Sequence, residues 1–237
     1  MELPFQFKQF SIDQQDSPFK VGTDGLLLGA WADFTDDESI LDLGSGTGLI
    51  ALMAAQRNSA AKIIGLEPSE IAFSNLLKNF KASKWSSRLE SIHLSWQEYL
   101  GNKQGKIDHI VCNPPFFISG QQKQDDDQAN ARHTNTLSIE DICLGAQQIL
   151  APNGKLSMIF PFEQLETNLE LFSLAGLYPK RICLARSRPK KPFHRSLVQV
   201  QNSPNWLIEQ SDMTLLEAKG YQRSNEFEAL TKDFLLD

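Results

Sequence analysis

The sequence predicts a doubly wound α/β fold, in which helices cover both faces of a mostly parallel sheet. Three observations support this prediction. Short apolar segments alternate with amphipathic ones, a glycine-rich turn follows the first such apolar segment, and the step Asn113-Pro114-Pro115-Phe116 follows the fourth. Repeated strand–helix units favour a parallel sheet with helices on both faces. A chain of 237 residues is long enough for one large domain of this kind but not for a second full core.

An aromatic-rich segment precedes the first strand of this sheet. Phe5, Phe7 and Phe10 are interleaved with polar residues and predict an extended or hairpin lead-in that packs on the core or lines a substrate cleft. An apolar helix follows as far as Trp31, and either Thr23 or Asp24 is suited to cap it. We expect residues 1–35 to pack on a domain of residues 36–237, so that the chain forms a single domain overall.

The remaining elements follow from hydrophobic periodicity. Strands are predicted at 40–43, 63–66, 89–94, 109–112, 156–160, 182–185 and 196–201, and helices at 49–57, 69–80, 138–150 and 225–236. The last two strands flank a loop at 186–195 and form a hairpin-like pair.

Charge is distributed unevenly along the chain. The formal net charge is −6, yet residues 171–204 contain no acid. Their cations are Lys180, Arg181, Arg186, Arg188, Lys190, Lys191 and Arg195. A local basic surface can bind phosphates despite an acidic total, and the alternative is a solvated loop that aids solubility.

Composition excludes several classes of protein. No apolar run is long enough to span a bilayer, and the first residues lack the features of a secretion signal. Cys112, Cys143 and Cys183 are odd in number and widely spaced, which is typical of free thiols in a reducing compartment. We therefore expect a cytoplasmic protein with no membrane contact, no metal site and no obligate protein partner.

The step at residues 113–116 is suited to aiming an amino group. Two prolines cannot continue the preceding strand, because each lacks an N–H and has a fixed φ, so the backbone is rigid there. The Asn113 side-chain oxygen and the Pro114 carbonyl can accept hydrogen bonds from the two N–H groups of one planar –NH₂. The Phe116 ring can stack on the flat system that carries this group. The structural alternative is a cis-proline turn with a buried amide.

A glycine turn lies upstream of this step. Gly44-Ser45-Gly46-Thr47-Gly48 follows Asp42 at the end of the first sheet strand and precedes an apolar helix. Glycines in this position let the backbone approach a ligand closely, although such a turn alone is weak evidence. Glu67 ends the second strand, where it can accept both hydroxyls of a ribose or simply lie exposed.

The spacing of this turn resembles motif I of class I S-adenosylmethionine (SAM) methyltransferases. The acid after the second strand and Asn-Pro-Pro-Phe after the fourth extend the resemblance in the same order. It implies a Rossmann-like class I methyltransferase fold with a mostly parallel seven-stranded sheet and an antiparallel edge. It also implies SAM as cofactor, with S-adenosylhomocysteine as product. The cofactor-binding residues would be Asp42, Gly44, Ser45, Gly46, Glu67, Trp96 and Asn113, Trp96 packing either on adenine or in the core.

The chemistry would be displacement at the sulfonium methyl carbon by a nitrogen. A nucleobase amine is a poor nucleophile, because its lone pair is delocalised into the ring. Hydrogen bonds to Asn113 and Pro114 would favour a more tetrahedral nitrogen, and Phe116 would stack on the base. No strong general base is required.

Further segments resemble the tRNA1(Val) adenosine-37 N6-methyltransferase family over nearly the whole chain. They are Phe7-Lys8-Gln9-Phe10, Phe19 to Trp31 with its run Lys20-Val21-Gly22-Thr23-Asp24-Gly25, Ala131-Arg132-His133-Thr134 and Pro192-Phe193-His194-Arg195. The resemblance implies a tRNA partner and methylation of N6 of the adenosine next to the anticodon of valine tRNA. The substrate-binding residues would be Lys20, Asp24, Arg132, His133, Lys190, Lys191, His194 and Arg195.

Two departures from the family pattern keep alternatives open. Phe116 stands where tyrosine is more usual, and the region after the third strand lacks the usual acid for the adenine of the cofactor. The alternatives are a ribosomal RNA guanine-N2 methyltransferase and a protein glutamine N5-methyltransferase, which also present a planar –NH₂. Both typically carry an additional N-terminal module. A SAM- or nucleotide-binding regulator without activity is a third alternative, against which the intact step at 113–116 argues.

Overall fold

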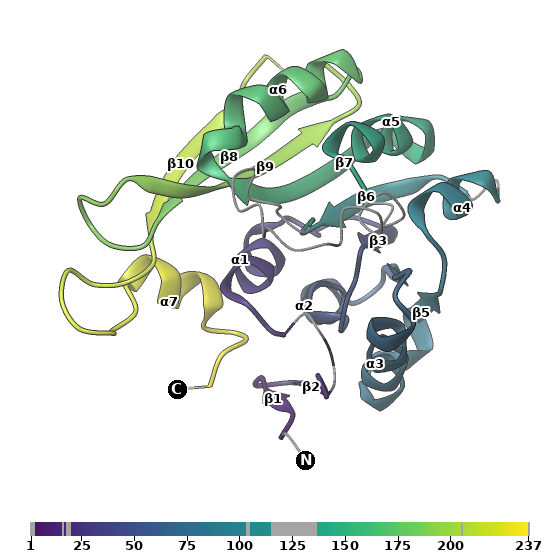
Figure 1. Cartoon of the computed structure of the whole chain (residues 1–237), viewed down its shortest axis with the longest axis horizontal. Helices are drawn as coiled ribbons and strands as arrows, with labels where there is room; N and C mark the ends of the chain where they lie inside the picture. Colours follow the sequence, from purple (N-terminus) through teal and green to yellow (C-terminus); the bar gives the residue numbers. More distant parts are fainter. Residues whose placement is uncertain are drawn as a thin grey trace, which may run out of the picture.

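An eight-stranded sheet forms the centre of the computed structural model, which describes residues 3–15, 17, 20–102, 105–114, 137–204 and 206–236 (Figure 1). The strand order is β10-β8-β9-β7-β6-β3-β4-β5. In chain order the strands are β3 (Ser39–Leu43), β4 (Lys62–Leu66), β5 (Leu89–Ile92), β6 (Ile107–Cys112), β7 (Leu150–Pro161), β8 (Tyr178–Arg186), β9 (Phe193–Gln201) and β10 (Glu209–Thr214).

The sheet is mostly parallel, as predicted, but it has one more strand than the predicted seven. Only β9 runs against its neighbours, β7 and β8, whereas β10 pairs parallel with β8 at the edge. The prediction missed β10 because most of its side chains are exposed, so that Glu209–Thr214 lacks an apolar pattern. The reversed strand β9 therefore lies inside the sheet, with β8 and the edge strand β10 outside it.

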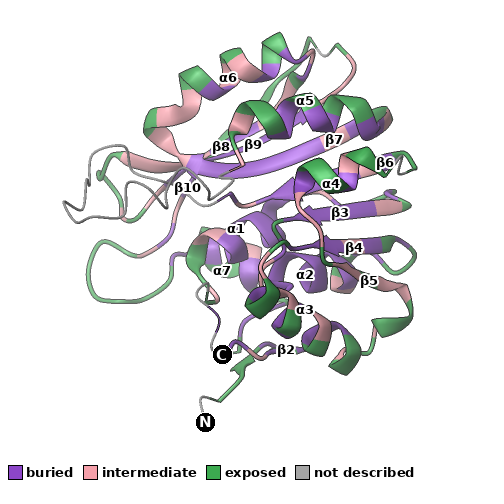
Figure 2. Cartoon of the chain, turned by 45° about the vertical axis from the view of Figure 1, so that its right-hand side comes forward, coloured by how far each residue is buried: buried purple, intermediate pink, exposed green. Residues whose placement is uncertain are grey.

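Helices cover both faces of this sheet (Figure 2). Side chains from α1, α2, α3 and α7 belong to one apolar cluster, and those from α4, α5 and α6 belong to the other. The helices are α1 (Thr23–Trp31), α2 (Leu49–Arg57), α3 (Glu70–Ala82), α4 (Trp96–Gly101), α5 (Ile139–Ile149), α6 (Leu165–Leu174) and α7 (Asn225–Thr231), with 3₁₀ turns η1 (Ser86–Arg88) and η2 (Phe162–Gln164). No helix in the described ranges has the length and apolarity to cross a bilayer.

Two helix predictions need correction, and two helices were not predicted. Helix α1 begins at Thr23 with Gly22 as its N-cap, so neither Thr23 nor Asp24 caps it. Helix α7 ends at Thr231, whose hydroxyl donates back to the Phe227 carbonyl, rather than continuing to 236. Helices α4 and α6 were not predicted, because α4 is only one and a half turns long and α6 is largely exposed with a weak apolar stripe.

The lead-in forms a short hairpin of β1 (Phe5–Gln6) and β2 (Ser11–Ile12). Phe7 and Phe10 are buried, and their rings stack with centroids 4.5 Å apart, whereas Phe5 keeps 38% of its surface exposed. Core packing is therefore the role of the two buried rings. They share a cluster with α1 and α2, and the single domain and its boundary at residue 36 both stay predictions.

Candidate active site

Strand register brings three predicted site segments to the same level of the sheet. Leu43 of β3 lies beside Leu66 of β4 on one side and Cys112 of β6 on the other. The residues that follow these three are Gly44, Glu67 and Asn113. Since all three strands are parallel, these residues leave the sheet together at its carboxyl edge, which is where α/β sheets place ligands.

The glycines of the turn have two different roles. Gly44 and Gly46 have φ of +71° and +57°, and beyond its own chain neighbours a Cβ on either would meet no atom of the described residues within 4 Å. Gly48 has φ of +89°, but its Cβ would lie 2.8 Å from Leu76 Cδ1 and 2.9 Å from Phe80 Cε1. The first two glycines thus border open space, whereas Gly48 allows α2 to pack closely on α3.

Asp42 is buried beneath this turn. One carboxylate oxygen accepts hydrogen bonds from the Ser45 hydroxyl at 2.7 Å and from the Ala51 N–H at 3.1 Å. Burial raises the pKa of Asp42 to about 7, although these two hydrogen bonds oppose the shift. Asp42 therefore braces the turn, and its charge changes near neutral pH.

Glu67 braces the same turn from the second strand. Its Oε2 accepts a hydrogen bond from the Gly46 N–H and its Oε1 accepts one from the Ser69 N–H, both at 2.8 Å. Burial raises the pKa of Glu67, and these backbone hydrogen bonds lower it. Each carboxylate oxygen retains a second lone pair, so the geometry leaves acceptors for a hydroxyl-bearing ligand.

Asn113 presents an unused acceptor. Its Oδ1 is buried and has no hydrogen-bond partner among the described residues. A buried amide oxygen without a donor costs about 1–3 kcal/mol, which a bound donor would recover. Pro114 is also buried, whereas Phe116, Arg132 and His133 lie outside the described residues.

Trp96 is buried in the core between α4 and α5. Its ring is 3% exposed, its Nε1 donates to the Asp141 carbonyl at 3.0 Å, and it fills the space beside Gly145. Of the two alternatives, this favours packing in the core over stacking on adenine. The nearby Glu98 accepts from the backbone and side chain of Ser95 in a capping box, so that it caps α4.

The three arginines of the loop at 186–195 all form ion pairs or hydrogen bonds within the protein. Arg195 Nε donates to Asp24 Oδ2 at 2.9 Å, which joins β9 to the first turn of α1. Arg186 pairs with Asp212, and Arg188 donates to two backbone carbonyls. The structure therefore brings Asp24 and Arg195 together as an ion pair. A direct substrate contact by either residue stays a prediction.

The remaining predicted substrate residues differ in exposure. Lys20, Lys190 and Lys191 are exposed. His194 is half-buried, and its Nδ1 has no partner in the described part of the chain. Burial, followed by the charge of Arg195, lowers the pKa of His194 and so favours the neutral imidazole.

Sequence patterns assigned no site role to two residues that support the site. Asn79 donates to the Thr47 carbonyl in the glycine turn at 2.8 Å and to the Asp13 carbonyl at 2.9 Å. A Cβ on Gly25 would lie 3.8 Å from Asn113 Nδ2, so α1 closely approaches the amide. The sequence did contain a sign of the role of Asn79. Asn75 and Asn79 are polar residues one turn apart on the otherwise apolar face of α3.

A serine–histidine–aspartate arrangement lies elsewhere in the sheet. His109 Nδ1 is 2.9 Å from Asp37 Oδ2, and its Nε2 is 2.8 Å from Ser157 Oγ. His109 and Ser157 are fully buried, Lys155 also pairs with Asp37, and burial lowers the pKa of His109. This network satisfies polar groups inside the sheet and lacks the access that a hydrolase needs.

Comparison with known proteins agrees with this geometry. Residues 10–171 match the methyltransferase small domain family. A tRNA1(Val) (adenine(37)-N6)-methyltransferase of Christiangramia forsetii is 39% identical over 236 residues, which is 98% of each chain. One of Vibrio vulnificus strain YJ016 is 40% identical over 233 residues, covering 98% of this chain and 95% of that one.

A solved structure supports the fold. It is described as a predicted O-methyltransferase of Agrobacterium tumefaciens, and it superposes with a TM-score of 0.69 over 89% of this chain and 96% of its own. Because the sequences are only 19% identical, this likeness concerns the architecture alone.

Proposed function

Because the chain belongs to the methyltransferase small domain family, and within it to the tRNA1(Val) (adenine(37)-N6)-methyltransferases, we propose that it methylates N6 of adenosine 37 in valine tRNA. The methyl donor is S-adenosylmethionine. The structural observation that carries the proposal is the buried Oδ1 of Asn113, which has no hydrogen-bond partner among the described residues. Asn113 leaves the sheet beside the glycine turn. Such an acceptor suits an amine that has hydrogens to donate.

The residues at the carboxyl edge fit this donor. The open space over Gly44 and Gly46 admits a ligand to within van der Waals distance of the backbone. Asp42 offers a negative charge for an ammonium group, and Glu67 offers lone pairs for ribose hydroxyls. SAM, when bound there, supplies an electrophilic methyl group on a positively charged sulfur.

The protein then has to orient the amine. Asn113 Oδ1 would accept one N–H of the adenine amino group and the Pro114 carbonyl would accept the other. These hydrogen bonds hold the nitrogen in place and favour the geometry in which its lone pair points at the methyl carbon. After transfer, the extra proton on nitrogen passes to solvent. Stacking by Phe116 and phosphate contacts by Arg132 or His133 are part of this proposal.

The competing substrates share this amine geometry. N2 of guanine and the glutamine side-chain amide also offer a planar –NH₂. The family of the relatives favours adenine, and the exposed lysines of the loop after β8 favour RNA over protein. A cytoplasmic location and the absence of an obligate protein partner stay predictions.

One experiment tests the substrate directly. The protein is incubated with labelled SAM and bulk tRNA, the RNA is digested to nucleosides, and the labelled nucleoside is identified. We expect label in N6-methyladenosine only. Label in N2-methylguanosine or in protein would contradict the proposal, and unlabelled products throughout would contradict activity on tRNA.

The pKa of Asp42 predicts how SAM affinity depends on pH. The pKa of Asp42 in the folded protein, about 7, lies above the ordinary value of 3.8. Ionisation of Asp42 therefore lowers the stability of the SAM-free protein as the pH rises from about 4 to about 7. SAM has a cationic amino group and favours the ionised carboxylate, so affinity should rise up to about tenfold between pH 6 and pH 7.5. Calorimetric titration measures this. Asp42→Asn should bind SAM weakly at both pH values. If the affinity of this variant still rose with pH as in the wild type, a group other than Asp42 would cause the pH dependence.

A further inference from the structure

A second loop lies at the same edge of the sheet as the candidate active site. Strand β10 is parallel to β8, and β8 has the direction of β7, β6 and β3. The chain therefore leaves β10 at the carboxyl edge, where the glycine turn follows β3 and Asn113 follows β6. This second loop, residues 217–223, is called the β10 loop here. It lies beside the hairpin that joins β8 to β9 (Figures 1 and 2).

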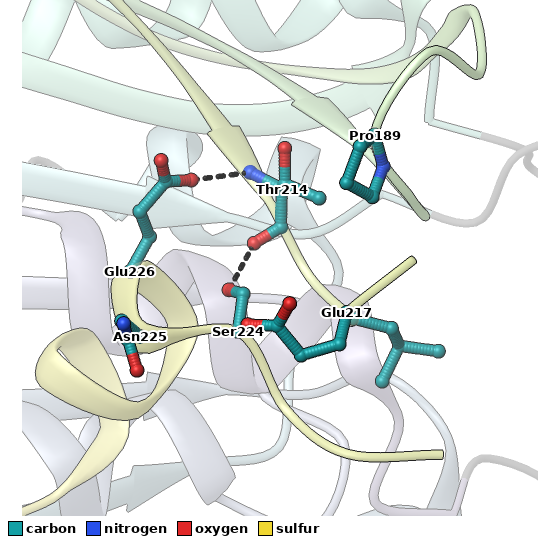
Figure 3. Close-up of a pocket in the computed structure, with 7 residues that line it drawn as sticks. Pro189, Thr214, Glu217, Ser224, Asn225 and Glu226 are labelled. Carbon is teal, nitrogen blue, oxygen red and sulfur yellow. Dashed lines mark hydrogen bonds between the residues drawn. The ribbon is translucent and has the colours of Figure 1, made fainter. Parts of the chain in front are cut away.

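The β10 loop is anchored rather than loose. Arg188, from the β8–β9 hairpin, donates to the Glu217 carbonyl at 2.7 Å and to the Gly220 carbonyl at 2.6 Å. Glu217 N–H donates to the Gln222 carbonyl, and Leu216 forms a β-bridge with Arg223. Its base is fixed by Ser224 and Glu226, which bond to the backbone of Thr214 at the end of β10 (Figure 3).

This anchored loop exposes an aromatic ring among cations. Tyr221 is 93% exposed, and the exposed Lys219 and Arg223 flank it two residues away on each side. In residues 187–195 and 217–223 together there are six cations, namely Arg188, Lys190, Lys191, Arg195, Lys219 and Arg223, and one acid, Glu217. Lys190 and Lys191 are exposed on the neighbouring hairpin. An aromatic face beside ammonium and guanidinium groups suits single-stranded nucleic acid, whose bases stack and whose phosphates attract cations.

We propose that Tyr221 stacks on an unpaired base of the RNA substrate, while Lys190, Lys191, Lys219 and Arg223 contact its phosphates. This inference rests on the proposed tRNA methylation and names a second contact surface for the same substrate. The β10 loop holds the RNA from the side of α7 while the target base enters the site at Asn113. Anchoring by Arg188 lowers the ordering cost of the loop on binding.

A second exposed aromatic residue provides a matched control. Trp206 is 95% exposed, but it precedes β10 and therefore lies at the opposite edge of the sheet. Residues 202–210 contain no lysine or arginine. Trp206→Ala thus removes an equally exposed ring from a surface that the RNA is not expected to touch.

The test compares tRNA binding by Tyr221→Ala, Tyr221→Phe and Trp206→Ala. We expect the alanine variant to bind tRNA about tenfold more weakly or worse, with SAM affinity unchanged, since stacking on one base is lost. The phenylalanine variant and Trp206→Ala should retain wild-type affinity. If Tyr221→Ala also binds tRNA like the wild type, the proposal is wrong.

Salt dependence separates the ring from the cations. Replacing Lys190, Lys191, Lys219 and Arg223 with alanine should flatten the slope of log affinity against log salt, whereas Tyr221→Ala should lower affinity with the slope intact. If the variant with all four substitutions had the wild-type salt dependence, these four cations would not contact RNA phosphates. Methylation by the wild type is recorded in parallel. If the wild type modifies tRNA but the variants bind normally, only this inference fails, and if it modifies no RNA, the proposed function fails.

Discussion

Turnover is expected to fall about a hundredfold or more when Asn113 is replaced by alanine, while SAM affinity stays within a few-fold of wild type. The reason is that the buried Oδ1 of Asn113 has no partner among the described residues and so remains for the substrate amine. Removing it leaves the amine without its orienting acceptor, and misplaced reacting atoms cost about that factor. Single-turnover methylation of tRNA measures the rate, and calorimetry measures SAM binding.

A control variant separates this effect from general damage. Asn102→Ala removes another asparagine amide, but one that is exposed at the end of α4. It should leave rate and affinity unchanged. An Asn113→Ala enzyme with wild-type single-turnover rate and saturating SAM would show that this amide does not orient the amine.

The second large effect concerns two glycines of one turn. We expect substitution of Gly48 to impair mainly folding stability and substitution of Gly46 to impair mainly SAM binding. Gly48→Ala should lower the free energy of unfolding by about 2–4 kcal/mol, because its Cβ would overlap Leu76 and Phe80 and its φ is positive. Gly46→Ala should cost only about 1–2 kcal/mol of backbone strain, since its Cβ has open space. That open space is where we place SAM, so Gly46→Ala should weaken SAM binding at least about tenfold.

Denaturant unfolding and SAM titration of both variants provide the measurements. The two glycines serve as controls for each other, because they are two residues apart in the same turn. If Gly46→Ala bound SAM as tightly as the wild type, the cofactor would not pass over this part of the turn. Equal destabilisation by both variants would contradict the separate roles assigned to them.

Much of the fold followed from the sequence, because the buried parallel strands have continuous apolar runs. The predicted strands at β3, β4 and β6 and the helix at 49–57 match the structure closely. β10 was missed because an edge strand need not be apolar. Helix α4 was missed because its capping box at Ser95 and Glu98 defines only six residues, too short for a periodic pattern.

The site was predictable as a set of positions but not as a set of contacts. The order of the glycine turn, Glu67 and Asn113 along the chain was enough to place them at one edge. The pairing of Arg195 with Asp24 was not predictable, since 171 residues separate the two and either charge alone suits a substrate contact. The same holds for Trp96, whose burial depends on the fit against Gly145 on another helix.

The contacts of Asn79 have a consequence for the order of folding. This side chain binds Asp13 in the lead-in and Thr47 in the glycine turn, so the turn acquires its support only after α3 has left the ribosome. The contact of Lys8 forms later still, because its N–H donates to the carbonyl of Phe234 near the C-terminus. Contacts of such long sequence separation form late. During synthesis, the lead-in emerges before the residues that it binds, so its contact with the C-terminal segment forms only after that segment has been made.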